Sequence, residues 1–132
     1  MQYLLKFYSS GNSNYVEDFI FSTEEFTQAK ILRSLDLIRK YGRAAGMPRV
    51  RKLAKDLLEL RIRGKQQVRL IFKQKGNEIY FLHGFVKKTN KTPTNEIKLA
   101  KKRFMLKGNF KPNIKKFNAN CVRAIKVSLK RI

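Results

Sequence analysis

Residues 57–88 read LLELRIRGKQQVRLIFKQKGNEIYFLHGFVKK, and their pattern sets the architecture that we expect. Apolar and β-branched residues fill three segments, 57–63, 68–75 and 78–88, each long enough for a strand. The two polar connections between them each contain a glycine, which is typical of hairpin turns. We therefore predict two consecutive hairpins, which together make three neighbouring strands of one sheet.

The middle strand has two different faces. One face is apolar, and the other carries a cation on each side of an isoleucine. The apolar face consists of Val68, Leu70 and Phe72, and the charged face of Arg69, Ile71 and Lys73. A sheet face of this kind is either solvated or binds anions, and the pattern alone leaves both interpretations open.

The chain before these strands predicts a strand and two helices. Residues 3–8 are rich in aromatic side chains and favour an opening strand. Residues 16–21 fit a strand or a short helix, and we favour a helix capped by Asn14. Ser22 and Glu25 have the spacing of a capping box, which predicts that a longer helix begins there.

That longer helix should end at Tyr41-Gly42, where a glycine follows the last apolar position. Residues 44–48 then form a loop, and residues 49–55 favour a short turn of helix. We expect the two N-terminal helices to form a hairpin that covers one face of the sheet.

The segments after residue 88 predict a loop and one more helix. Residues 89–93 are polar and end in a proline, and Thr94 or Asn95 should cap a helix over 96–106. The predicted domain spans residues 1–107. Residues 108–132 form a basic C-terminal extension that begins with a helix-breaking run of glycine, asparagine and proline.

The charge of the chain predicts a polyanionic partner. The 132 residues include 31 Lys and Arg against 9 Asp and Glu, a net charge of +22. So large an excess of positive charge destabilises a small domain, because the charges repel one another. Binding to a polyanion relieves this repulsion. The extension contains seven of these cations and none of the acids, so the predicted domain is strongly basic by itself.

Several classes of function find no support in the sequence. No apolar run approaches the ~20 residues of a membrane-spanning helix, and the first residues do not resemble a signal peptide. We therefore expect a cytoplasmic protein with no membrane partner. Cys121 is the only cysteine and His83 the only histidine, so we expect no disulfide, no metal site and no cofactor.

Three groups of cations lie on the predicted strands and on the loop after them. They are Arg61 and Arg63 on the first strand, Arg69 on the second, and Lys87, Lys88 and Lys91 at the end of the third. In a meander such groups become cross-strand neighbours, and they repel one another unless an anion lies among them. Lys101 and Lys102 of the last helix face either water or a phosphate backbone.

A cluster of this kind can cleave RNA without a metal. The 2′-hydroxyl attacks the adjacent phosphorus, and cations stabilise the negative charge that develops in the transition state. A lysine crowded by other cations has a lowered pKa and can act as a general base. The competing interpretation is a face that binds phosphates, or only water, without any reaction.

Two further residues have structural and catalytic interpretations. Glu59 is the only acid in the first strand, and an ion pair with nearby arginines accounts for it as well as catalysis does. His83 lies inside the third strand, where a buried and hydrogen-bonded structural role is the better interpretation.

Five segments follow one another in an order that resembles a known family. They are Val50–Leu53, Leu58–Arg61, Val68–Phe72, Phe81–Pro93 and Glu96–Ala100. Over residues 1–107 the chain resembles the phage-derived, HigB-like branch of the RelE/ParE toxin superfamily. The arginine-bearing strand and the stretch FLHGFVKKTNKTP are the more specific parts of this resemblance.

The resemblance implies a fold, an activity and partners. The fold would be α+β and RelE-like, with an N-terminal helical hairpin and a C-terminal helix packed on a twisted antiparallel sheet. The activity would be ribosome-dependent cleavage of mRNA by the toxin of a type II toxin–antitoxin module. The antitoxin would be a HigA-like helix-turn-helix protein.

Carried onto this sequence, the resemblance also implies site residues. Arg61 and Arg69 match the strand cations of the family, and Lys87 and Lys88 match its loop cations, so these four are the predicted catalytic residues. We expect Arg63, Lys73, Lys91, Lys101 and Lys102 to bind RNA. The alternatives are a ParE-like inhibitor of DNA gyrase that catalyses no reaction and a non-toxic RNA-binding relative.

Overall fold

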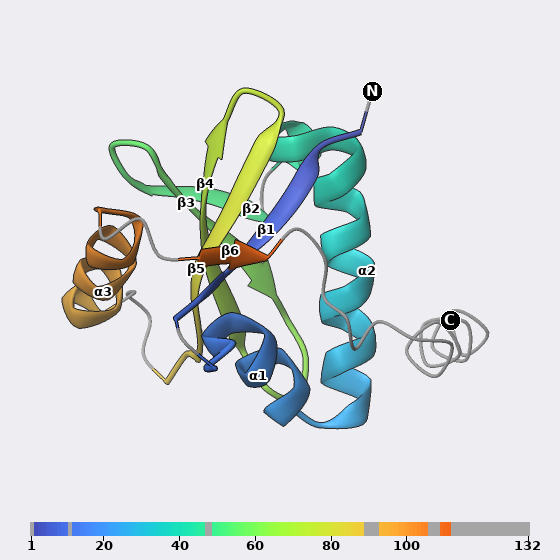
Figure 1. Ribbon diagram of the computed structural model, residues 1–132. Helices are drawn as coiled ribbons and strands as arrows, with labels where there is room; N and C mark the ends of the chain where they lie inside the picture. The colour runs from blue at the N-terminus through green and yellow to red at the C-terminus, as the bar shows by residue number, and fades with distance from the viewer. Residues whose placement is uncertain (1, 11, 47–48, 89–92, 106–108, 112–132) are drawn as a thin grey trace.

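Residues 57–88 form three consecutive antiparallel strands in the computed structural model, as their pattern predicts (Figure 1). These strands are β3 (Leu57–Ile62), β4 (Val68–Lys75) and β5 (Glu78–Val86). The structure describes residues 2–10, 12–46, 49–88, 93–105 and 109–111.

The three strands form the centre of a larger sheet whose strand order is β2-β3-β4-β5-β1-β6. The other strands are β1 (Leu4–Ser9), β2 (Val50–Ala54) and β6 (Asn109–Lys111). The helices are α1 (Tyr15–Ser22), α2 (Glu25–Tyr41), the 3-10 turn η1 (Gly42–Ala45) and α3 (Thr94–Met105). The predicted α+β class is confirmed.

The helices cover the sheet in two layers (Figure 1). Helices α1 and α2 form the predicted helical pair and pack on one face, where Ile20 and Leu35 meet the strand residues Leu60 and Leu70 in the main core. Helix α3 packs on the opposite face over a smaller core around Ile71. Within the described ranges, no helix is long and apolar enough to cross a membrane.

The sheet is mixed, so the prediction of an antiparallel sheet is wrong at one position. Strand β1 runs parallel to β5, with Lys6 opposite Tyr80 and Phe7 opposite Phe81. The Phe7 and Phe81 rings stack at 5.2 Å. The sequence of residues 3–8 indicates a strand, but the partner and direction of that strand depend on this distant packing.

Residues 50–54 form strand β2, and the predicted turn of helix there is wrong. Strand β2 pairs with β3 in antiparallel register, with Val50 opposite Leu60. The connection includes Asp56, whose φ of 66° lies in the left-handed region that aspartate tolerates better than most residues. Pairing with β3 along this tight hairpin outweighs the weak local preference for helix.

The junction between the two N-terminal helices also differs from the prediction. Helix α2 begins at Glu25 after Glu24, so Ser22 is the last residue of α1 and caps nothing. The Ser22 hydroxyl donates instead to the Phe19 carbonyl at 2.6 Å, within the last turn of α1. Asn14 occupies the N-cap position of α1 but forms no capping hydrogen bond through its side chain.

The sheet continues past the predicted domain boundary at residue 107. Helix α3 lies close to its predicted span, and the short strand β6 that follows it pairs with β1. Strand β6 therefore belongs to the predicted C-terminal extension in sequence and to the sheet in structure. Residues 112–132 of the extension lie outside the described residues.

A β-bulge in β5 changes which face its later residues occupy. Phe72 lies opposite Phe81, whereas Ile71 lies opposite His83, so the intervening Leu82 is extra. Phe81 belongs to the main core, and Leu82 belongs to the smaller core beneath α3. After the bulge, His83 shares the α3 face with Ile71, although strict alternation would place it on the same face as Phe81.

Gly84 allows α1 to approach the sheet closely. A Cβ atom at this position would lie 2.5 Å from Phe19 Cδ2 and 2.7 Å from Leu70 Cδ2. Both atoms belong to side chains that pack in or against the main core, so neither can move without disturbing its neighbours.

We expect Gly84→Ala to lower the free energy of unfolding by ~1–3 kcal/mol, because the added methyl group overpacks this core. Urea unfolding would measure the change. Gly64→Ala is the control, since a Cβ there would meet the flexible end of Lys30. Equal stability of the two variants would show that α1 does not depend on this contact.

Candidate functional site

Strand pairing brings the predicted strand cations together on the α3 side of the sheet. Arg61 of β3 lies directly opposite Arg69 of β4, and Arg69 lies opposite Phe85 of β5. In the next row, Glu59 of β3 lies opposite Ile71 on one side and Arg51 of β2 on the other. Side chains directly opposite on one face of a sheet are close neighbours.

The bulge in β5 adds a lysine to this group. With the phase that the bulge sets, Phe85 and Lys87 follow His83 on the α3 side of the sheet. The backbone N–H of Lys87 donates to the Gln67 carbonyl at 2.6 Å, which continues the pairing of β4 and β5 by one residue. We call Arg51, Arg61, Arg69, Lys87 and the central Glu59 the cationic cluster.

Glu59 is the buried anion of the cationic cluster. Its side chain is 1% exposed, and its Oε1 lies 3.6 Å from Arg69 Nε and 3.9 Å from Arg61 Nε. A buried carboxylate needs such partners, because removing an unpaired charge from water is very costly. Of the two interpretations of Glu59, the structure shows the ion pair with nearby arginines.

Arg69 is the most deeply buried cation of the cluster. The whole residue is 3% exposed, and its guanidinium donates a hydrogen bond to the Val68 carbonyl at 3.1 Å. Burial lowers the pKa of Arg69, the Glu59 carboxylate opposes that effect, and Arg61 and Arg63 lower it further. An arginine nevertheless stays protonated at neutral pH, so the site holds a fixed and partly desolvated positive charge.

Lys87 lies in the electrostatic field of the same group. Burial and then the charge of Arg69 lower its pKa, Glu59 partly opposes them, and Arg61 and Arg51 lower it further. The lowered pKa means that more of this lysine is neutral at a given pH than for an ordinary lysine. Crowding by cations acts in the predicted direction on Lys87, and burial is the larger cause of its lowered pKa.

The other predicted site residues lie around the cluster. Arg63 follows β3 and is exposed, yet it is close enough to influence the pKa of Arg69. Lys88 is exposed next to Lys87, beyond the end of β5. Lys101 and Lys102 are exposed on α3. Lys91 lies outside the described residues.

Lys73 lies apart from the cluster on the same face of the sheet. Its ammonium group is 4.0 Å from the centre of the Phe104 ring of α3, a cation–π contact. Along β4, Ile71 lies between Lys73 and Arg69, the member of the cluster that this strand contributes. This contact with α3 accounts for the position of Lys73 without any role in RNA binding.

Sequence reasoning missed Arg51 because it expected a turn of helix at residues 49–55. Strand β2 places Arg51 opposite Glu59, and the charge of Arg51 acts on Lys87. The sequence contains a signal for the strand that carries Arg51. The polar pair Lys55-Asp56 lies between residues 50–54 and the start of β3, which is the pattern of a short hairpin. Asp is a common residue in such turns.

A second polar group borders the cluster, where α3 joins the sheet. His83 Nε2 is hydrogen-bonded to the Glu96 carboxylate, and an Arg103 guanidinium nitrogen lies 3.3 Å from His83 Nδ1. Because arginine only donates, Nδ1 accepts and the proton of a neutral His83 is on Nε2. Burial lowers the pKa of His83 more than Glu96 raises it, which agrees with the predicted structural role.

The arrangement is suited to binding a phosphate. The cluster contains four cations and one acid, and its deepest residues are almost fully desolvated. Glu59 alone does not balance the positive charge of the cluster. A phosphate between Arg61, Arg69 and Lys87 would compensate the remaining positive charge. Among the residues that the structure describes, no three His, Cys, Asp or Glu side chains come together in a way that could hold a metal ion.

We expect Glu59→Gln to lower the free energy of unfolding by about 3 kcal/mol, because it leaves buried arginines without their carboxylate. Urea unfolding at low salt would measure the loss, and added sulfate should restore part of it by occupying the cluster. Glu25→Gln, at an exposed position of α2, is the control. If the two variants were equally stable, Glu59 would not be needed to balance the cluster.

One comparison with known proteins identifies the family. The model of the family described as "Phage derived protein Gp49-like (DUF891)" matches residues 18–105, about two thirds of the chain. A search of curated proteins gives no match. The matched residues extend from α1 to the end of α3 and include the whole cationic cluster. The chain therefore belongs to the family of phage-derived Gp49-like proteins.

Proposed function

We propose that this protein is the toxin of a type II toxin–antitoxin module, with a RelE-like fold and HigB-like activity, and that it cleaves mRNA on the ribosome in the cytoplasm. The observation that carries the proposal is the cationic cluster. It combines two arginines held by a buried carboxylate with a lysine whose pKa is lowered. Membership of the Gp49-like family and the resemblance to RelE/ParE toxins support the same conclusion.

The cluster and the exposed Lys88 beside it supply groups for each part of the reaction. Neutral Lys87 accepts the proton of a ribose 2′-hydroxyl as the O2′–P bond forms. Arg61 and Arg69 stabilise the charge that develops on the non-bridging phosphate oxygens. The P–O5′ bond then breaks, and Lys88 can protonate the leaving oxygen. The products would carry a 2′,3′-cyclic phosphate and a 5′-hydroxyl.

Growth arrest by this protein should be accompanied by new mRNA ends. Induction in bacteria, followed by mapping of RNA ends, should show internal cuts in translated messages that carry 5′-hydroxyl groups. Intact messages in arrested cells would rule out the proposal. Intact messages together with a DNA-damage response would instead favour a ParE-like inhibitor of DNA gyrase.

The proposed partner is a HigA-like helix-turn-helix antitoxin. A strongly basic toxin needs a partner that blocks its RNA-binding face or its entry into the ribosome. Co-expression with the product of the neighbouring reading frame should restore growth and yield a stable complex. Growth arrest that the neighbouring product does not relieve would argue against this pairing.

We expect Arg61→Ala to slow cleavage about 10²-fold, because it removes one donor to the transition-state charge. Arg61 is a better test than Arg69, since Arg69 is almost fully buried and its loss would also affect folding. Cleavage of a defined message on purified ribosomes would measure the rate. Arg43→Ala removes an exposed arginine outside the cluster and should leave the rate unchanged. Equal rates for the two variants would remove Arg61 from the reaction.

The rate of cleavage should rise with pH as Lys87 loses its proton, up to a pKa below that of ordinary lysine. Lys87→Arg keeps the positive charge but removes the base, so the rate should fall and the rise with pH should disappear. Single-turnover cleavage over the range in which ribosomes are stable would measure this. Lys98→Arg, on the exposed side of α3, should keep the wild-type profile. An unchanged profile in Lys87→Arg would assign the base elsewhere.

A further inference from the structure

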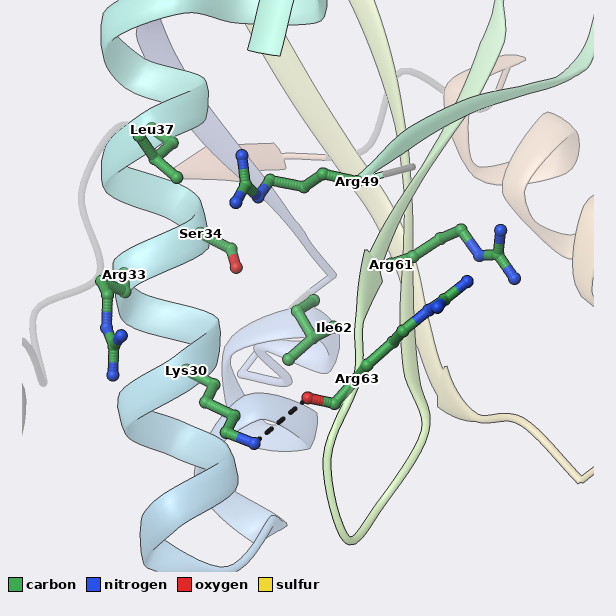
Figure 2. Close-up of a pocket in the computed structure, with 8 residues that line it drawn as sticks. All are labelled: Lys30, Arg33, Ser34, Leu37, Arg49, Arg61, Ile62 and Arg63. Carbon is green, nitrogen blue, oxygen red and sulfur yellow. Dashed lines mark hydrogen bonds between the residues drawn. The ribbon is translucent and has the colours of Figure 1, made fainter. Parts of the chain in front are cut away.

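A groove lies between helix α2 and strand β3, away from the α3 side of the sheet (Figure 2). It has a volume of about 450 Å³. Lys30, Ser34 and Leu37 line it from α2, and Arg49, Arg61 and Ile62 line it from the sheet. Of these residues the proposed reaction uses only Arg61, whose side chain lies in the cationic cluster.

The polar groups of the groove converge on the space between α2 and β3. Figure 2 shows the Arg49 side chain extending toward α2, with the Ser34 side chain directed into the same space. The Lys30 ammonium lies at one end of the groove and donates to the Arg63 carbonyl at 3.2 Å. The backbone of Arg49 is fixed, because its carbonyl accepts a hydrogen bond from the Arg61 N–H at 2.8 Å.

The charge of the groove is uniformly positive. Its described lining contains lysine and arginine but neither aspartate nor glutamate. Asp36 of α2 does not offset this charge, because it is paired with Arg39 and Lys40 of the same helix. An arginine fork, a hydroxyl donor and an ammonium group are the groups that bind phosphate oxygens.

The groove is continuous with the cationic cluster through β3. Arg61 and Arg63 both contribute to the lining of the groove, whereas Figure 2 shows their side chains extending away from α2. The Arg61 side chain reaches the cluster, with Nε 3.9 Å from Glu59. The cluster and the groove lie on opposite sides of the sheet, and Arg61 and Arg63 join them at the end of β3. A polyanion bound at the cluster would therefore pass these two arginines on its way to Arg49.

We propose that this groove binds a backbone phosphate of the same RNA strand, outside the position of cleavage. The proposal rests on the proposed function for its choice of RNA as the polyanion, and the continuity across β3 favours RNA over an acidic protein segment. The groove adds affinity and holds the strand in place, while the cluster carries out the reaction. Arg49 supplies the main contact to the phosphate, since the Lys30 ammonium is already hydrogen-bonded to the Arg63 carbonyl.

Binding of an RNA that cannot be cleaved separates this proposal from the proposed function. The probe is a fluorescent 12-nucleotide 2′-O-methyl oligouridylate, and its affinity is measured over a range of salt concentrations. The salt slope is the slope of the logarithm of the binding constant against the logarithm of salt concentration. Arg49→Ala should weaken binding about fivefold at 0.1 M salt, because the loss of one phosphate contact lowers the magnitude of this slope by about 0.7. Arg43→Ala, another exposed arginine, should change neither value. Arg49 is itself exposed, so the variant should fold normally.

Two outcomes would overturn the proposal. In the first, Arg49→Ala and Arg43→Ala bind the oligonucleotide equally well, with the same salt slope. In the second, Arg49→Ala binds RNA normally but loses affinity for an oligoglutamate peptide, which would assign the groove to an acidic protein partner. Neither outcome depends on cleavage, and the absence of cleavage on ribosomes would leave this measurement intact.

Discussion

The buried ion pair between Glu59 and Arg69 is the constraint on which the charged half of the sheet depends. Both side chains are almost fully removed from water, at diagonal positions on neighbouring strands. Neither charge could stay there without the other, since an isolated buried charge costs several kcal/mol. The Glu59 carboxylate reduces the repulsion among the cations around it. Arg61, Arg51 and Lys87 can therefore lie closer to one another than they could without an anion.

The pair also explains why the two faces of the sheet have different roles. The face beneath α1 and α2 is filled by apolar residues, and the close contact at Gly84 shows how tightly it is packed. The opposite face is covered only in part by α3, which packs on Ile71 and Leu82. The remainder of that face carries the cluster, on rigid strands instead of flexible loops, so its cations are positioned before any ligand binds.

Much of the fold could be predicted from the sequence because its signals are local. The alternation in residues 68–73 and the glycines at positions 64 and 76 predict β4 and its two turns, and these elements are as expected. Local signals failed where a distant partner decides the structure. Residues 50–54 become a strand because β3 lies beside them, and β1 pairs with β5, far along the chain, where Phe7 stacks on Phe81. Ser22 carries the signal for a helix start, but in the structure it is the last residue of α1.

For the candidate site, the sequence by itself determined the types of side chain and their excess of positive charge. It also showed that Arg61 and Arg69 lie on neighbouring strands of a hairpin. The tertiary structure decided the rest. Register places Arg61 opposite Arg69, and the bulge at Leu82 shifts Phe85 and Lys87 by one position. Without that extra residue Lys87 would lie on the face beneath α1 and α2, because side chains alternate strictly along a regular strand. A bulge arises from how two strands pair and pack, and no single stretch of this sequence specifies it.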